Sequence, residues 1–265
     1  MGIAITLGDE MAFKHPHFND DSLSVETRYI LDWAHEKGIA YHKRHILDIG
    51  AGTGVLSIPL AQRGASSVTS IDSCATELEI LREDALKTNL HSIISTSFCD
   101  WASFQLTRTY DIVIASLTPA ISSYADIDKM IAATHNVGIF VGWGDYKKNT
   151  FIDRLIPYHS QPARSFNEEG IYVKDFAQYV KEKDIPYCSD YFETSWEVVM
   201  TFDEARNYAS NELTKRHILP NDSIIEAFLH FHGTNNLLTV TLTAQKGIVE
   251  FFVDNTNIQT FCSLK

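Results

Sequence analysis

The sequence lacks several features that would assign it to a class at once. No apolar run approaches the roughly 20 residues that a membrane-spanning helix needs. The first ten residues lack the basic region of a secretory signal. The four cysteines are scattered, without the close pairs of zinc sites or redox motifs. Reduced thiols in a cytoplasmic protein are therefore expected.

Basic residues are scarce as well. The chain has 22 Lys and Arg against 34 Asp and Glu, which gives a formal net charge of −12. A nucleic-acid-binding surface needs basic groups that neutralise phosphates, so this balance disfavours a DNA or RNA substrate. Hydrophobic residues make up 45%, as in a globular protein with a core. The length suits one large domain, or one domain that carries an insertion.

Short apolar strands alternate with helices in the first part of the chain. Apolar runs bounded by turn residues predict buried strands over 45–49, 67–71, 93–98, 110–116 and 137–143. Helical patterns predict helices over 24–37, 55–62 and 76–87. This alternation predicts an α/β fold with a doubly wound, mostly parallel sheet and helices on both faces.

The later part of the chain has a different pattern. We expect a helix over 173–183, a strand over 191–202, and helices over 203–213 and 222–232. Asp203 is a plausible N-cap for the second of these three helices. Two strand-like segments, 237–243 and 247–254, are separated by a short turn at 244–246, which predicts a hairpin.

The strongest local signal is a buried strand that runs directly into a glycine-rich turn. Asp48 lies at the strand end, and Gly50, Gly52 and Gly54 follow at intervals of two. Glycines there let the backbone bend tightly and approach a ligand. The next strand ends at Asp72, where a carboxylate suits the two hydroxyls of a ribose. The nicotinamide-binding fingerprint GxGxxG would need its third glycine at position 55, which is valine.

This motif resembles that of the class I S-adenosylmethionine (SAM)-dependent methyltransferases, whose first motif is DxGxGxG. Asp72 stands at the family's ribose-binding position, and Cys-Asp-Trp at 99–101 stands near the expected adenine. The resemblance implies a seven-stranded Rossmann-like sheet and SAM as the cofactor, with S-adenosylhomocysteine (SAH) as the product. The residues placed at the cofactor are Asp48, Gly50, Ala51, Gly52, Gly54, Asp72, Ser73, Asp100, Trp101 and Ser116.

The resemblance also places the acceptor beside the loop after the fourth strand. Ser116 and Thr118 in this Ser-Leu-Thr-Pro loop could orient an acceptor hydroxyl, and Asp145 is a candidate base. Relatives that methylate adenine or glutamine nitrogens often carry Asn or Asp, two prolines and an aromatic residue here, so that substrate class is in doubt. A structural reading also stays open, in which the loop is a capped turn and Pro119 opens a helix.

The helix and strand pattern and the resemblance to the methyltransferase family together divide the chain into four segments. Residues 1–44 are the expected N-terminal helical segment or lid, and 45–202 the SAM-binding Rossmann-like core. Residues 203–236 are an expected helical insertion, because about 34 residues are long for a plain connection. Residues 237–265 would form a C-terminal hairpin that completes the sheet. The insertion could be a cap over the acceptor or a packing or dimerisation element.

We therefore expect a cytoplasmic SAM-dependent methyltransferase with a small or medium-sized acceptor and without a membrane partner. A homodimer is left open. No metal is expected, because His15, His17, His230 and His232 lack a tight ligand spacing. The alternatives are a SAM-binding partner or regulatory protein without catalysis, and a methyltransferase of protein or nucleic acid. The catalytic base, if there is one, is unknown.

Overall fold

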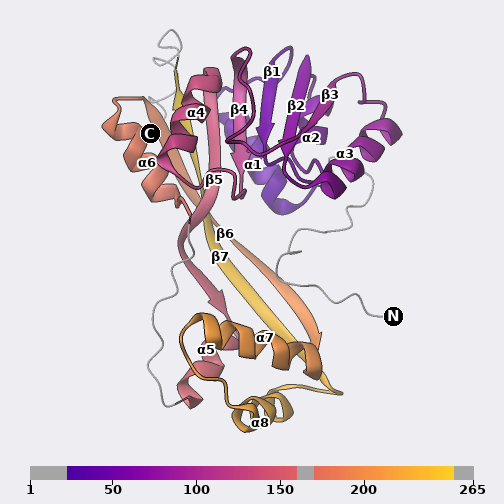
Figure 1. Ribbon diagram of the computed structural model, residues 1–265, viewed down its shortest axis with the longest axis vertical. Helices are drawn as coiled ribbons and strands as arrows, with labels where there is room; N and C mark the ends of the chain where they lie inside the picture. Colours follow the sequence, from indigo (N-terminus) through magenta and orange to yellow (C-terminus); the bar gives the residue numbers. More distant parts are fainter. Residues whose placement is uncertain (1–22, 160–169, 254–265) are drawn as a thin grey trace. The chain divides into compact units, whose positions relative to one another are not determined.

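The fold is built on one seven-stranded sheet whose strands are connected largely by helices (Figure 1). The computed structural model describes residues 23–159 and 170–253. The strand order is β3-β2-β1-β4-β5-β7-β6. The strands are β1 (His45–Ile49), β2 (Ser67–Asp72), β3 (Ile94–Phe98), β4 (Tyr110–Ser116), β5 (Thr134–Asn149), β6 (Tyr187–Thr201) and β7 (Leu237–Phe252).

The first five strands pair in parallel with one another. Parallel neighbours need crossover connections, and helices supply most of them. The helices of this part are α1 (Val25–Glu36), α2 (Ser57–Gln62), α3 (Ala75–Lys87), α4 (Tyr124–Ala133) and α6 (Val173–Glu182). The seven-stranded, mostly parallel α/β sheet confirms the predicted fold class.

The chain divides into two compact units. Among the described residues, the larger unit holds 23–144, 170–191 and 246–253, and the smaller unit holds 145–159 and 192–245. The strands β5, β6 and β7 contribute residues to both. The smaller unit thus takes in more than the insertion expected at 203–236, because it includes the ends of these three strands. The division into lid, core, insertion and C-terminal segment stays a prediction.

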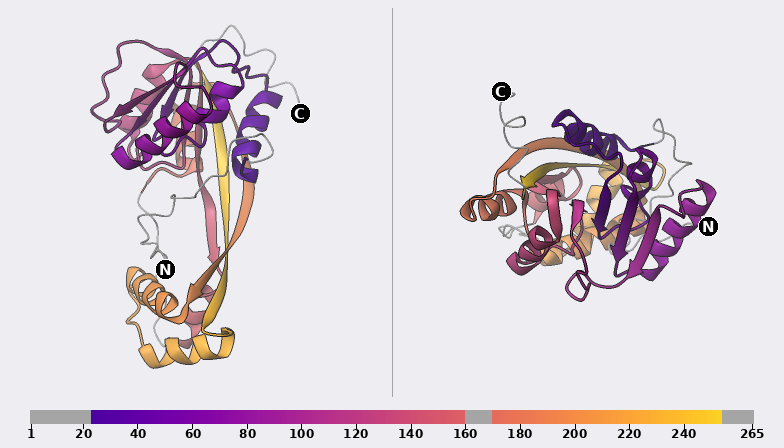
Figure 2. Two further views of the ribbon diagram at one scale, coloured as in Figure 1. Left: turned by 90° about the vertical axis from the view of Figure 1, so that its right-hand side faces the viewer. Right: turned by 90° about the horizontal axis from the view of Figure 1, so that it is seen from above.

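Buried apolar side chains attach helices to the sheet of the larger unit, and helices cover both of its faces (Figure 2). Phe176 of α6 stacks on Phe140 of β5, with ring centroids 4.3 Å apart. Phe251 of β7 lies 5.8 Å from Phe176, measured in the same way. In α3, Leu78 and Leu81 are fully buried. None of the helices in the described ranges is long and apolar enough to cross a membrane.

Helix α4 was missed by the sequence analysis, and Pro119 does not open it. The helix begins at Tyr124, five residues after Pro119, because Ser123 and Asp126 form a capping box. The backbone N–H of Ser123 donates to Asp126 Oδ2 at 2.9 Å, and that of Asp126 donates to Ser123 Oγ at 3.3 Å. Reciprocal capping of this kind satisfies N–H groups that have no partner inside the helix.

The predicted hairpin at the end of the chain is wrong, because β7 is one continuous strand. The expected turn, 244–246, stays extended because its side chains have partners in the sheet and on α1. Gln245 Oε1 accepts a hydrogen bond from the N–H of Asp145 at 2.9 Å. Lys246 forms an ion pair with Glu26 of α1 at 2.5 Å. A glycine at 247 reflects close packing here, since a Cβ would lie 2.9 Å from the carbonyl oxygen of Asp190.

The strand β7 runs antiparallel to both of its neighbours. On the β6 side, Phe252 N–H donates to Pro186 O at 2.9 Å, while Ser195 Oγ donates to Leu242 O at 3.2 Å. Residue numbers therefore rise along one strand as they fall along the other, as in an antiparallel pair. The same holds for β5, since β5 enters the smaller unit as the chain advances and β7 leaves it.

The smaller unit contains α5 (Ile152–Leu155), α7 (Phe202–Lys215) and α8 (Asp222–His232) around its own apolar core. Asp203 is not the N-cap of α7, as the sequence had suggested. Thr201 caps the helix through a capping box with Glu204, whose Oε2 accepts the N–H of Thr201 at 2.8 Å. Asp203 lies in the first turn and pairs with Arg206 at 2.6 Å.

One carboxyl group lies in the core of the larger unit. The side chain of Glu250 on β7 is fully buried, and its Oε1 has no hydrogen-bond partner among the described residues. Its Oε2 lies 3.5 Å from Cys188 Sγ, which donates to it. Burial raises the pKa of Glu250 to about 8. The folded protein therefore holds this proton at neutral pH, whereas the unfolded chain releases it.

This proton makes stability depend on pH. The raised pKa means that the folded state binds more protons between the unfolded and folded pKa values, so stability falls as pH rises toward 8. From pH 6 to pH 8 we expect wild type to lose about 2 kcal/mol through this group. In Glu250→Gln that loss disappears, as thermal or urea unfolding at both pH values would show. Glu197→Gln, at an exposed glutamate, should keep the wild-type slope. Equal slopes in all three proteins would contradict the assignment.

Candidate functional site

The glycine-rich turn after β1 is held against the end of β2. The N–H groups of Gly50 and Ala51 both donate to the carbonyl oxygen of Ile71, at 2.9 and 3.0 Å. Gly50, Gly52 and Gly54 have φ values of +68°, +53° and +89°. These values lie in the left-handed region, where a side chain would be strained. The sequence therefore needs glycine at these positions for the turn to take this shape.

Asp72 binds this turn to the start of α3. Its Oδ2 accepts the N–H of Gly52 and its Oδ1 accepts the N–H of Cys74, each at 2.8 Å. A carboxylate has about four lone-pair sites, so both oxygens keep capacity for further hydrogen bonds. The half-buried Asp72 can therefore organise the turn and still accept hydroxyl groups of a ligand.

Asp48 lies beneath the turn, with only 2% of its surface exposed. Ser57 Oγ donates to Asp48 Oδ2 at 2.5 Å and lies 2.7 Å from Ser70 Oγ. Burial raises the pKa of Asp48 to about 6, the hydrogen bond from Ser57 opposes this rise, and the nearby charge of Asp72 adds to it. Asp48 is thus mostly ionised at pH 7 but close to its protonation range.

The loop after β4 touches the glycine turn. Thr118 lies so close to Gly50 that a Cβ on this glycine would come within 2.0 Å of Thr118 Oγ1. The same oxygen accepts the N–H of Ala120 at 3.2 Å. Between Ser116 and Thr118, Leu117 has a φ of +49°, an uncommon conformation for a large side chain and one that often marks functional loops. The structure therefore brings the predicted acceptor loop and the predicted cofactor turn into contact.

The residues after β3 divide between surface and core. Asp100 is exposed, as is Ser73 after β2. Trp101 is only 3% exposed, and its Nε1 donates to the carbonyl oxygen of Asp126 at 3.2 Å. Lys129 Nζ donates to the carbonyl oxygen of Trp101 at 2.5 Å. The indole of Trp101 thus packs in the core, whereas Asp100 is exposed, and the place of both beside the adenine stays a prediction.

The structure does not group every predicted residue at the turn. Asp145 belongs to the smaller unit, where its side chain is exposed. His15 and His17 lie outside the described residues. Arg154 Nη2 lies 3.2 Å from Nδ1 of His232. Within residues 23–159 and 170–253, no group of three or more His, Cys, Asp or Glu is arranged to hold a metal ion.

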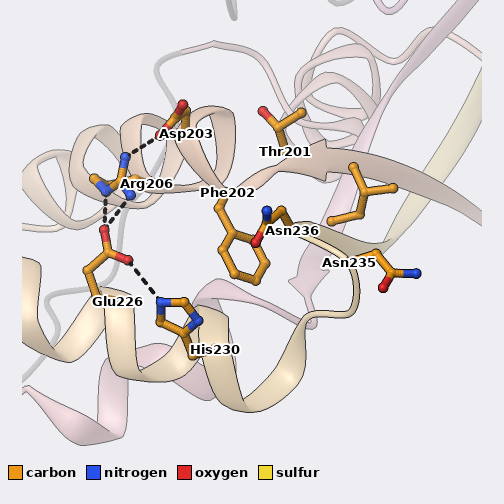
Figure 3. Close-up of a pocket in the computed structure, with 9 residues that line it drawn as sticks. Thr201, Phe202, Asp203, Arg206, Glu226, His230, Asn235 and Asn236 are labelled. Carbon is orange, nitrogen blue, oxygen red and sulfur yellow. Dashed lines mark hydrogen bonds and ion pairs between the residues drawn. The ribbon is translucent and has the colours of Figure 1, made fainter.

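A pocket of about 400 Å³ lies in the smaller unit, between the start of α7, α8 and the turn before β7 (Figure 3). Its charged side chains are paired with one another. Arg206 forms ion pairs with Asp203 and Glu226, and His230 Nε2 lies 3.9 Å from Glu226 Oε2. The lining is completed by two asparagines, Thr201, Phe202 and Leu237. His230, which the sequence had not indicated as a metal ligand, lies here beside Glu226.

Two residues at the turn were missed by the sequence analysis. Ser57 holds Asp48, and its place in the helix directly after the glycine turn is the only signal that could have indicated it. Glu77 lies in the first turn of α3, and a Cβ on Gly52 would be 3.0 Å from its Oε2. Its spacing of five residues from Asp72 gives no sign of this contact, which depends on how α3 packs.

Comparison with known proteins points to one family. Residues 46–137 match the family model of a methyltransferase domain. The tRNA1(Val) (adenine(37)-N6)-methyltransferase of Vibrio vulnificus (strain YJ016) is 34% identical over 77 residues, which are 29% of this chain and 32% of that protein. The enzyme of the same name from Glaesserella parasuis serovar 5 (strain SH0165) is 31% identical over 74 residues, 28% and 32% of the two chains. The chain spans about a third of the length of these curated relatives.

A solved structure is similar over most of the chain. It is that of a candidate sarcosine dimethylglycine methyltransferase from Galdieria sulphuraria, with a TM-score of 0.52 and 12% identity. The match covers 88% of this chain and 86% of the other. This structural similarity shows that the two proteins share a fold.

The contact between Gly50 and Thr118 can be tested by a pair of substitutions. We expect Gly50→Ala to lower the free energy of unfolding by about 2–4 kcal/mol, because the new methyl group overlaps Thr118 and the backbone is left-handed. Adding Thr118→Gly should recover part of this loss, since the overlap is removed while the backbone strain stays. Gly170→Ala is the control, with a positive φ but no neighbour within 4 Å. If the double variant is no more stable in urea than Gly50→Ala, the two loops do not meet as described.

Proposed function

We propose that this chain, whose residues 46–137 form the methyltransferase domain of a class I SAM-dependent methyltransferase, transfers the methyl group of SAM to a small or medium-sized acceptor. The observation that carries the proposal is the contact of the Ser-Leu-Thr-Pro loop with the glycine turn at Gly50. A cofactor bound along the turn would have this loop beside its reactive end.

The cofactor would be held by the turn and by the acidic residues around it. Asp72 would accept the ribose hydroxyls through the lone pairs that its two backbone partners leave, and Asp100 would lie near the adenine. Asp48 would attract the amino group of the cofactor from beneath. These three carboxylates favour a cationic cofactor and repel the phosphates of a dinucleotide, in agreement with the valine at position 55.

The chemistry needs little from the protein beyond position and shielding. Bound SAM supplies a methyl group on a positively charged sulfur, which makes direct displacement by an acceptor atom possible. The hydroxyl groups of Ser116 and Thr118 would orient that acceptor, and holding it in line accounts for most of the acceleration. An acceptor that loses a proton would also need a base.

A nucleic-acid acceptor is the second candidate, because both curated relatives are named as tRNA methyltransferases. The matched stretch covers less than a third of this chain. The loop after β4 does not carry Asn or Asp followed by two prolines, and the net charge is −12. We therefore favour an acceptor that is not a nucleic acid, either a small molecule or a protein side chain, with the small molecule first.

The direct test is calorimetric titration with SAM, SAH and NAD in parallel. We expect micromolar binding of SAM and SAH and no binding of NAD. Acceptors can then be screened by SAH release, with a tRNA pool at low and high salt as the nucleic-acid arm. Binding of NAD alone, or of none of the three, would refute the proposal. SAM binding without turnover of any acceptor would instead favour a partner or regulatory protein.

Protonation of the buried Asp48 should make SAM binding at this site depend on pH. Because a cationic cofactor prefers the ionised carboxylate, SAM affinity should fall as pH drops through the pKa of about 6. Between pH 7.5 and 5.5 we expect a loss of about fourfold, the ratio of the ionised fractions. Asp48→Asn should bind SAM more weakly and show no such change. A flat profile in the folded wild type would mean that Asp48 does not meet the cofactor's charge.

A further inference from the structure

Three buried polar side chains meet beneath the glycine turn, each from a different element. Asp48 of β1 and Ser70 of β2 are register partners in a parallel pair, so their side chains project from the same face of the sheet. Ser57 of α2 lies over this face, and both serines are fully buried. Ser57 Oγ lies 2.5 Å from Asp48 Oδ2 and 2.7 Å from Ser70 Oγ. The serine of the helix therefore connects the two strands.

The hydroxyl protons of this cluster can be placed by counting donors. An ionised carboxylate only accepts hydrogen bonds, so the hydroxyl proton of Ser57 goes to Asp48. A serine has one such proton, so Ser57 accepts from Ser70 and does not donate to it. Each bond in such a chain polarises and strengthens the next. Because a protonated carboxyl gains less from a donor than a carboxylate does, this arrangement favours the ionised form of Asp48.

The hydroxyl group of Ser57 is not used by its own helix. Helix α2 has Leu56 at its N-cap and no side-chain hydrogen bond to its first N–H groups. On the other side of Asp48, its register partner on β4 is Ile114, whose side chain has no donor. Among the described residues, the charge that acts on Asp48 is that of Asp72, and it opposes ionisation. Burial opposes ionisation too, so the buried charge depends on the hydroxyl and the backbone N–H of Ser57.

We propose that Ser57 is a positioning residue that keeps the Asp48 carboxylate ionised for the positively charged amino group of the cofactor. The inference rests on the SAM-binding role proposed above. Because Ser57 is fully buried, it cannot touch a ligand in the turn and acts only through Asp48. The lower pH limit of cofactor binding is thereby set by a hydroxyl group that the cofactor never meets.

The first test follows SAM affinity against pH in wild type and Ser57→Ala. Loss of the hydroxyl should raise the pH at which affinity is halved by about one unit, because a buried carboxylate loses its side-chain donor. The loss of affinity between pH 7.5 and 5.5 would then grow from about fourfold to about 25-fold. Ser70→Ala is the matched control, since it makes the same change at an equally buried serine whose hydroxyl bonds to Ser57. It should shift the midpoint much less.

A second measurement needs no cofactor. The carboxyl carbon NMR resonance that Asp48→Asn removes reports the ionisation of Asp48 in the free protein, and its midpoint should rise by the same amount in Ser57→Ala. An unchanged midpoint in the folded variant, or an equal rise in Ser70→Ala, would overturn the inference. So would an NMR midpoint that rises while the SAM profile stays in place.

Two further results keep the test decisive. If Ser57→Ala does not fold, Ser57→Cys supplies a side chain of similar size with a weaker donor, and it should still raise both midpoints. Unchanged midpoints in this variant would contradict the role of the hydroxyl. Wild type that binds no SAM at any pH would refute the proposed function itself, which is a different result from an unchanged midpoint.

Discussion

The pair of hydrogen bonds made by the Asp72 carboxylate is the interaction on which the rest of the site depends. It joins three elements at once, because the side chain belongs to β2 and its partners are the glycine turn after β1 and the first residues before α3. Those N–H groups would otherwise point toward water or a ligand without an internal acceptor. Since both donors are backbone groups, Asp72 is the one side chain that has to be ordered to make the link, and the turn is fixed before any cofactor arrives.

Hydrogen bonds around the turn explain how Asp48 and Asp72 can lie close together. Asp48 is desolvated but receives a hydrogen bond from Ser57, and Asp72 is stabilised by two backbone dipoles at the start of a helix. Each carboxylate has a local reason to be tolerated, and their summed field acts on whatever enters the site. A site built this way would select by charge as well as by shape.

Much of the larger unit could be predicted from the sequence because its signals are local. The strand 45–49 and the run 110–116 have the bounds that were expected, and the helix after Ser24 begins at Val25. What was missed depends on partners distant in sequence. Residues 244–246 read as a turn, yet Lys246 finds Glu26 more than two hundred residues away and the strand continues. The contacts of Thr118 and Glu77 with the glycines of the turn likewise could not be predicted, because these residues are distant from the glycines in sequence.

The order of segments along the chain has a consequence for how the protein is made. The larger unit includes residues 246–253, which follow the whole smaller unit in sequence, and their strand lies between β5 and β6. On the ribosome, therefore, the parallel strands β1 to β5 can assemble early, while the edge of the sheet at β5 stays open until β7 has emerged. Long-range pairing of this kind is slow and leaves an unpaired strand edge exposed in the meantime. The yield of folded protein would then depend on the time between synthesis of β5 and of β7. Chaperones that shield open edges would affect this yield more than the stability of the folded protein.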